Sequence, residues 1–459
     1  MAEFDPSQLR AALSLVEARI EDERQARYIP GIVALVLHDQ ETVWQQSFGQ
    51  ADVAKGTRPA ADTIFRIGSI TKMFAATMLM QLRDAGRLQL DDPVEKHLPE
   101  FKIASAFPDP RPVTFRQLAG HMAGMPREGP LNHWATGNFP PLETMLASLK
   151  DTSLVFAPWT KFKYSNLGTA VLGGALGRIA GLPFREYVTQ HILKPLGMHS
   201  TYFEVPEEAK ARLATGYVTA REQAIVAPYP DIGSMAPAGQ LYSTAVDLAK
   251  FTMLQLRPGP SSGAQILGGT SLREMYTAVF LKPNWDGATG IGWHLRRLVG
   301  ETVVGHSGGI YGFSADLRFV PDLKLGFVIL SNIGKGADTN IEDVTDAVLE
   351  ALLPVVRRVQ ARGQALDNLA AAKDWAKYLG RYYIPGVDYE VEVRLVGGRL
   401  TGIWTGLPAS ENMALTPRGN HQFLIEGGTV YDGDTLAFEL DQQGKSTALN
   451  VGGFQLRAR

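Results

Sequence analysis

The sequence has no cysteine among its 459 residues. That absence excludes disulfide bonds, thiolate metal sites and a cysteine nucleophile, so covalent chemistry has to use another side chain. A surplus of charge of either sign is also missing, because the formal net charge is −2. A chain without a basic surplus has little electrostatic attraction for polyphosphates, and we expect no nucleic-acid partner.

Long apolar runs are missing from the first 28 residues, which carry Asp, Glu and Arg throughout. This pattern fits neither a secretory signal nor a membrane anchor, so we expect no membrane partner. It favours a cytoplasmic location, or a periplasmic one if an export signal has been trimmed. The nine histidines are scattered without H-E-x-x-H or comparable spacing, and we expect neither a metal nor a cofactor.

The length and the hydrophobic periodicity predict two domains, because 459 residues exceed one average core. The pattern predicts a helix, a hairpin, a mostly helical middle, a second group of strands and a closing helix, at residues 6–26, 31–49, 71–256, 301–331 and 341–353. The economical assembly is an α+β fold in which both ends of residues 1–356 build one antiparallel sheet. The two terminal helices would back the sheet, with the helical region inserted between its halves and a cleft between sheet and helices.

The C-terminal part of the chain differs in composition and in hydrophobic pattern. Residues 357–373 are rich in Ala, Gln and Arg, which indicates a helix tail or a linker. Residues 374–459 contain short runs of alternating apolar and polar residues, such as 389–395, separated by turn residues such as Gly397 and Gly398. We expect a small all-β barrel there.

The first candidate for chemistry is Ser69, in the run RIGSITK (66–72) at the start of an apolar-periodic helix. Lys72 follows it by about one helical turn, so we expect the amine beside the Ser69 hydroxyl, while the helix N-terminus favours a developing oxyanion. For Lys72 to act as a base at neutral pH, its pKa has to fall by roughly three units from ~10.4. The alternative interpretation is that Ser69 caps the helix and Lys72 is a solvated side chain.

Two further segments carry side chains suited to catalysis. In the run KYSN (163–166), Tyr164 can relay a proton, and Asn166 can hold a substrate carbonyl or a lysine. The alternative is a partly buried tyrosine followed by a capping asparagine. The run GHSGG (305–309) ends a predicted strand, where an edge can pair with an extended substrate and offer N–H donors. The alternative there is a glycine-rich strand end with a surface histidine.

The order S-x-x-K, then Y-x-N, then H-x-G resembles the penicillin-recognising serine hydrolases, a group that includes class C β-lactamases, D-peptidases and family VIII carboxylesterases. The runs TFRQL (114–118), HMAGMP (121–126) and QLYST (240–244) are similar to further segments of that group. The resemblance covers about residues 29–332. It implies a β-lactamase-like fold, in which helices flank an antiparallel sheet that holds a mostly α insertion.

The resemblance also implies roles for the matched residues. Ser69 would be the acylated nucleophile and Lys72 its first partner. Tyr164 would be the general base and the acid for the leaving group, although whether Lys72 or Tyr164 takes the first proton stays open. Asn166 would orient the substrate.

The H-x-G segment would complete the site. His306 would polarise Tyr164 or approach a substrate carboxylate. The N–H groups of Ser69 and Gly309 would form the oxyanion hole. The run HSG (306–308) stands where efficient β-lactamases have Lys-Thr-Gly, which removes a fixed cation and resembles the D-peptidases of the group. Strong β-lactamase activity is therefore not expected.

We expect a serine hydrolase that forms an acyl-enzyme on Ser69 and cleaves amide or ester bonds of small substrates. D-amino-acid peptides are the leading substrates because of His306. A carboxylesterase with weak β-lactamase activity and a catalytically silent binding protein are the alternatives. The C-terminal barrel resembles the lipocalin-like appendage of some peptidases and esterases of this group, and whether it covers the cleft or mediates a homo-oligomer stays open.

A rival interpretation uses Ser307, because GHSGG (305–309) also fits G-x-S-x-G, the nucleophile elbow of α/β-hydrolases. The elbow requires a helix after the serine, whereas residues 310–319 alternate as a strand does and include Gly312. The histidine downstream of this run is His421, in the separate β region. We therefore prefer Ser69 as the nucleophile.

Overall fold

The computed structural model describes residues 9–108, 111–131, 133–219, 223–257, 264–334, 340–387, 389–404, 412–428 and 430–459. The chain divides into two units, Leu9–Pro354 and Val355–Arg459. The helix α12 (Ile341–Trp375) contains the point of division. Residues 357–373, expected as a helix tail or a linker, continue this helix.

The first unit is built on an eight-stranded sheet in the order β2-β1-β12-β11-β10-β9-β8-β7. In that order the strands are Glu41–Gly49, Gly31–His38, Leu325–Ser331, Phe313–Val320, Glu301–Ile310, His294–Leu298, Gly287–Thr289 and Phe280–Leu281. Each pair of neighbouring strands in this sheet is antiparallel. β1 pairs with β12, with Leu35 opposite Val328, so both ends of the unit meet in one sheet, as the sequence predicts.

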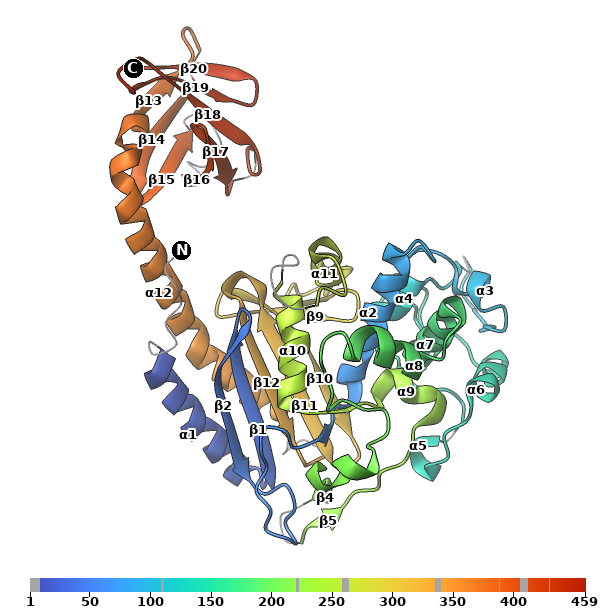
Figure 1. Ribbon diagram of the computed structural model, residues 1–459. Helices are drawn as coiled ribbons and strands as arrows, with labels where there is room; N and C mark the ends of the chain where they lie inside the picture. The colour runs from blue at the N-terminus through green and yellow to red at the C-terminus, as the bar shows by residue number, and fades with distance from the viewer. Residues whose placement is uncertain are drawn as a thin grey trace. The chain divides into compact units, whose positions relative to one another are not determined.

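The central strands are apolar and buried because both faces of the sheet are covered. Every residue of β11 and β12 is buried, and such continuous runs are typical of strands packed on two sides. On one face, Val33 and Leu35 join the same core cluster as Phe74 and Phe251 of the helical layer. Figure 1 shows α10 (Ala245–Gln255) in front of the sheet, and α1 (Arg10–Ala26) to the left of the sheet, next to β2.

The helical region lies between β2 and the returning strands. Its helices α2 to α9 are Thr71–Asp84, Val94–His97, Phe115–Ala119, His133–Thr136, Leu142–Ser148, Asn166–Ala180, Phe184–Val188 and Ala236–Gly239, and α11 is Gly269–Met275. Two small two-stranded sheets accompany them, formed by β3 (Phe65–Arg66) with β6 (Tyr242–Ser243) and by β4 (Tyr217–Thr219) with β5 (Ile225–Val226).

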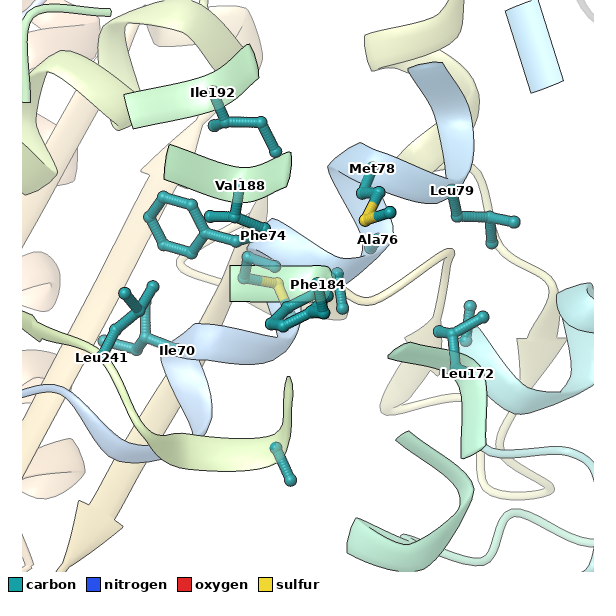
Figure 2. Packing of buried hydrophobic residues seen from close by; sticks show 14 of the residues in the cluster. Ile70, Phe74, Ala76, Met78, Leu79, Leu172, Phe184, Val188, Ile192 and Leu241 are labelled. Atoms are coloured by element: carbon teal, nitrogen blue, oxygen red, sulfur yellow. The ribbon is translucent and has the colours of Figure 1, made fainter. Parts of the chain in front are cut away.

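Helix α2 is the central element of this region. Eleven of its fourteen residues are buried, which leaves little of its surface for solvent. Figure 2 shows Phe74 and Met78 of α2, with Ile70 just before the helix, in the same apolar cluster as Leu172 of α7 and Val188 of α8. Packing on all sides therefore fixes the start of α2, and with it the neighbouring Ser69.

Apolar content alone does not distinguish these helices from membrane segments. Within the described ranges, no single helix is both long and apolar enough to span a membrane; the bent pair Asn166–Ala180 and Phe184–Leu193 reaches that length and composition together. The inward face of α7 packs in the core, where Leu167, Val171 and Leu176 are buried.

The second unit contains a closed barrel of eight strands, β13 to β20. They are Gly380–Tyr383, Glu390–Val396, Arg399–Trp404, Asn412–Gly419, Gln422–Glu426, Thr435–Leu440, Ser446–Val451 and Phe454–Ala458. Side chains along each strand point alternately into and out of the barrel. Val391 and Val393 of β14 are buried, and their neighbours are more exposed. Large rings such as Trp404 and Phe438 fill the interior. The predicted barrel is confirmed, with three strands, β13, β16 and β19, that the sequence pattern did not indicate.

Candidate active site

Ser69 lies in a single 3-10 turn, Gly68–Ile70, directly before α2. Gly68 adopts a φ of +49°, and a Cβ there would come 2.7 Å from Gly309 N, so both its backbone angle and its surroundings require glycine. Thr71 Oγ1 donates a 2.7 Å hydrogen bond to Gly68 O and closes the turn. Ser69 is half-buried, so a tight, fixed turn presents its hydroxyl to ligands.

Lys72 is the nearest basic group to that hydroxyl. Its Nζ lies 3.1 Å from Ser69 Oγ, 2.8 Å from Asn166 Oδ1 and 2.7 Å from the Ala238 carbonyl oxygen. The residue is 3% exposed. Burial lowers the pKa of Lys72 to about 7, with Glu128 opposing the shift and Arg127 adding to it. The amine is therefore substantially neutral near neutral pH.

Tyr164 is the second group in contact with the Ser69 hydroxyl. Its hydroxyl donates a 2.8 Å hydrogen bond to Ser69 Oγ. The Lys72 Nζ lies 4.9 Å from the centre of the tyrosine ring, and the His121 ring lies 4.5 Å from it, centre to centre. Burial raises the pKa of Tyr164 to about 12. The phenol therefore keeps its proton at neutral pH.

Asn166 is the first residue of α7, where Ser165 caps the helix by accepting a 2.7 Å hydrogen bond from Gly168 N. The cap fixes the helix start and so the position of the Asn166 amide. Its Oδ1 accepts from Lys72, and its Nδ2 donates a 2.6 Å hydrogen bond to Glu128 Oε1. The amide therefore links the amine to a carboxylate.

His306 lies on β10 and is 2% exposed. Its Nδ1 is 2.6 Å from the Ser307 carbonyl oxygen, and because a carbonyl can only accept, Nδ1 carries the proton. Nε2 is then an acceptor, and it has no hydrogen-bond partner among the described residues. Burial lowers the pKa of His306 well below 6.5, and His294 and Lys72 add to the effect. The ring is thus neutral, so it cannot supply the charge that a substrate carboxylate needs.

Gly309 belongs to an exposed edge of β10. The register of β10 with β9 ends at Gly305 opposite His294, whereas its pairing with β11 continues to Ile310. A Cβ on Gly308 would come 1.9 Å from Ile67 O and 3.1 Å from Ser69 N. The backbone around Ser69 therefore lies against the backbone around Gly309. An oxyanion hole formed by the N–H groups of these two residues requires this close approach.

The elbow interpretation of Ser307 is wrong. Ser307 pairs with Asp316 in the middle of an antiparallel ladder, and β10 continues to Ile310. A turn at Tyr311 and Gly312 then leads into β11, not into a helix. For the same reason, residues 305–309 lie within a strand rather than at its end.

The structure brings Ser69, Lys72, Tyr164, Asn166, His306 and Gly309 into one site, and it adds residues that the sequence pattern did not single out. Glu128 binds the Asn166 amide. The His294 ring lies 4.7 Å from the ring of His306, centre to centre. Glu128 lies two residues after the run HMAGMP (121–126), so the family resemblance of that run was the available signal. No short-range spacing connects it to Asn166.

Among the described residues, no group of three or more His, Asp or Glu side chains is arranged to hold a metal ion. The chemistry available to this site is that of a hydroxyl, a buried amine, a phenol and backbone donors. Such a set fits nucleophilic attack on a carbonyl carbon with proton transfer by neighbouring groups.

The Beta-lactamase family model matches residues 16–351 of this chain. Beta-lactamase-like protein 2 of Dictyostelium discoideum is 30% identical over 363 residues, which make up 77% of this chain and 65% of that protein. Protein flp of Staphylococcus aureus is 26% identical over 319 residues, or 69% of this chain and 62% of that protein. The chain thus spans a little under two thirds of the length of these curated relatives.

Solved structures show the same arrangement of elements. An octameric penicillin-binding protein homologue from Pyrococcus abyssi is 25% identical, with a TM-score of 0.66 over 97% of this chain and 99% of that one. A class C β-lactamase from Rhodobacter sphaeroides is 21% identical, with a TM-score of 0.64 over 74% of this chain and 99% of that one. The second comparison shows the fold alone.

Proposed function

The chain belongs to the Beta-lactamase family, and we propose that it is a serine hydrolase that forms an acyl-enzyme on Ser69. The observation that carries the proposal is the pair of contacts at the Ser69 hydroxyl: the Lys72 amine at 3.1 Å and the Tyr164 phenol at 2.8 Å. A serine becomes a nucleophile when a neighbouring base takes its proton. Both groups needed for acyl transfer are within reach.

Lys72 is the base in the first step. A neutral amine has two N–H donors and one lone pair. The Asn166 and Ala238 oxygens accept the two donors, which leaves the lone pair for the Ser69 proton. Tyr164 is protonated at neutral pH, because its pKa is about 12. It therefore does not compete for that proton.

The reaction then follows the usual course of acyl transfer. Ser69 Oγ bonds to the substrate carbonyl carbon as its proton moves to Lys72, and the carbonyl oxygen becomes an oxyanion between the N–H groups of Ser69 and Gly309. The bond to the leaving group breaks as that group receives a proton from the Tyr164 hydroxyl, which is replenished from Lys72. Water repeats the sequence, with its oxygen as the nucleophile and Ser69 as the leaving group.

The substrate is proposed to be a small ester or amide without a carboxylate beside the scissile bond. The sequence favours D-amino-acid peptides because of His306, but a neutral His306 with a free acceptor at Nε2 suits a substrate N–H or O–H rather than a carboxylate. D-peptides remain a second candidate because of Arg127. Its side chain is 63% exposed, and its guanidinium lies 5.4 Å from the Tyr164 ring centre.

A panel of p-nitrophenyl esters and of D- and L-aminoacyl anilides tests this proposal. We expect the esters to turn over and to acylate Ser69, and D-anilides ahead of L-anilides if the protein is a D-peptidase. Faster turnover of L- than of D-anilides rejects the D-peptidase candidate. A protein that forms no adduct with any ester, amide or β-lactam is the binding protein of the alternative interpretation.

We also propose that the protein is a homo-oligomer. The proposal is supported by the similarity to a homologue that is octameric and that this chain matches over almost its whole length. Light scattering coupled to size exclusion gives the mass directly. A particle of 50.0 kDa, the mass of one chain, contradicts it.

A further inference from the structure

Glu128 is the carboxylate that the loop before α5 brings to the site. Its Oε1 accepts the 2.6 Å hydrogen bond from Asn166 Nδ2, and its Oε2 accepts one of 2.7 Å from the Trp134 indole. Arg127 Nε lies 3.5 Å from Oε1, and His133 Nε2 lies 3.9 Å from Oε2. The hydrogen bonds from Asn166 and Trp134 therefore hold this carboxylate in one place.

The position of Glu128 decides which end of the Asn166 amide faces Lys72. The amide oxygen faces Lys72, and the amide nitrogen faces Glu128. In the reversed orientation, the NH2 group would meet the N–H groups of Lys72 and the oxygen would meet the carboxylate, and both contacts are repulsive. Glu128 thus selects the orientation in which Asn166 accepts a hydrogen bond from the amine.

Glu128 also acts on Lys72 by its charge. The titratable and charged groups that face Lys72 are His121, Arg127, Glu128, Tyr164, His294 and His306. In the part of the chain that the structure describes, Glu128 is the carboxylate of this set. Its charge raises the pKa of Lys72 against the burial that lowers it. A base whose pKa lies far below the working pH accepts a proton poorly.

We infer that Glu128 is a positioning residue, which fixes the Asn166 amide toward Lys72 and, by its charge, keeps the Lys72 amine basic enough to take the Ser69 proton. The part that concerns Ser69 rests on the proposed function. The part that concerns the amide and the amine rests on the contacts alone.

Glu128→Gln tests the inference because it removes the charge and preserves the size of the side chain. We expect the acid limb of kcat/KM for a p-nitrophenyl ester to move to lower pH by about half a unit or more, because Lys72 gives up its proton more readily without a nearby anion. Glu128→Asp, which keeps the charge, should hold the limb close to its original position. Glu143→Gln, at an exposed carboxylate of α6, is the control and should not move it. A limb that stays in place in Glu128→Gln, or moves to higher pH, overturns the inference.

A second measurement needs no substrate. In protein labelled with 13C-lysine, the Cε signal of Lys72, identified by its loss in Lys72→Arg, titrates with the amine. We expect its midpoint to fall in Glu128→Gln. A fall in a protein that acylates no substrate supports the inference and contradicts the proposed function. An unchanged midpoint in a protein that does acylate Ser69 contradicts the inference and supports the proposed function.

Glu128→Asp carries the test if Glu128→Gln does not fold. The shorter side chain draws the carboxylate away from the Asn166 amide and leaves the charge nearby. We expect kcat/KM on the alkaline plateau to fall about tenfold, which is the loss of one hydrogen bond to a charged group, with the acid limb in place. An Asp variant as active as the original protein overturns the positioning role.

Discussion

Tyr164 donates a 2.8 Å hydrogen bond to Ser69 Oγ, the same oxygen that lies 3.1 Å from the Lys72 amine. A phenol with a pKa of about 12 holds its proton until a stronger base appears. A departing alkoxide or amide nitrogen is such a base. The contact therefore suits Tyr164 to the second half of acylation, in which the leaving group needs a proton.

Tyr164→Phe should consequently affect substrates according to their leaving groups. We expect kcat for an anilide to fall by about 10²- to 10⁴-fold, the usual contribution of a general acid. A p-nitrophenyl ester should lose much less, because p-nitrophenolate leaves without a proton. Tyr187→Phe, on α8, serves as the control. Equal losses on both substrates contradict a role in leaving-group protonation.

The pH dependence should report the state of Lys72. Because its pKa is about 7 and the proposed mechanism requires the neutral amine, kcat/KM for an uncharged ester should rise with pH and reach half of its plateau near pH 7. Tyr164 titrates far above that range, so the plateau should persist to about pH 9. A stopped-flow profile that is flat between pH 5.5 and pH 8.5 contradicts this role for Lys72.

The buried histidines should make the fold sensitive to acid. Burial lowers the pKa of His294 to about 4 and that of His306 well below 6.5, while the unfolded chain has ordinary histidines. Below pH 6.5 the unfolded chain binds protons that the folded chain does not, so stability is lost as the pH falls. We expect the thermal midpoint to drop between pH 6.5 and pH 4, and His294→Gln to reduce that slope. If calorimetry finds the same dependence of the thermal midpoint on pH in His294→Gln and in the original protein, the role of His294 in acid sensitivity is contradicted.

Gly308 should be intolerant of a side chain. A Cβ there would come 1.9 Å from Ile67 O, and the backbone beside Ser69 would have to move. We expect Gly308→Ala to lower kcat by about 10²-fold or more, because an oxyanion donor is displaced. Gly268→Ala is the matched control, since Gly268 is exposed and its Cβ would meet nothing within 4 Å. Similar activity in the two variants contradicts the close approach.

The sequence predicts those features whose cause is local. Ser69 and Lys72 are one turn apart, so helix geometry alone brings them together. The hairpin of β1 and β2 and the alternation in β14 are equally local. The order of the three motifs, through the family resemblance, adds Tyr164 and His306.

The other features of the fold and the site depend on contacts between residues far apart in the sequence, which no short sequence pattern predicts. Glu128 and Asn166 are 38 positions apart and meet only because the loop before α5 folds onto the start of α7. The tautomer of His306 depends on the Ser307 carbonyl. Strands β7, β8 and β9 are short and carry little apolar alternation, and each forms on the edge of the strand before it in the sheet: β9 on β10, β8 on β9 and β7 on β8.

The most direct test of the account is mass spectrometry of the protein after reaction with a fluorophosphonate probe. We predict one adduct, on the peptide that contains Ser69, formed faster at pH 8 than at pH 6. It should disappear in Ser69→Ala and persist in Ser307→Ala. An adduct that persists in Ser69→Ala contradicts the assignment of the nucleophile.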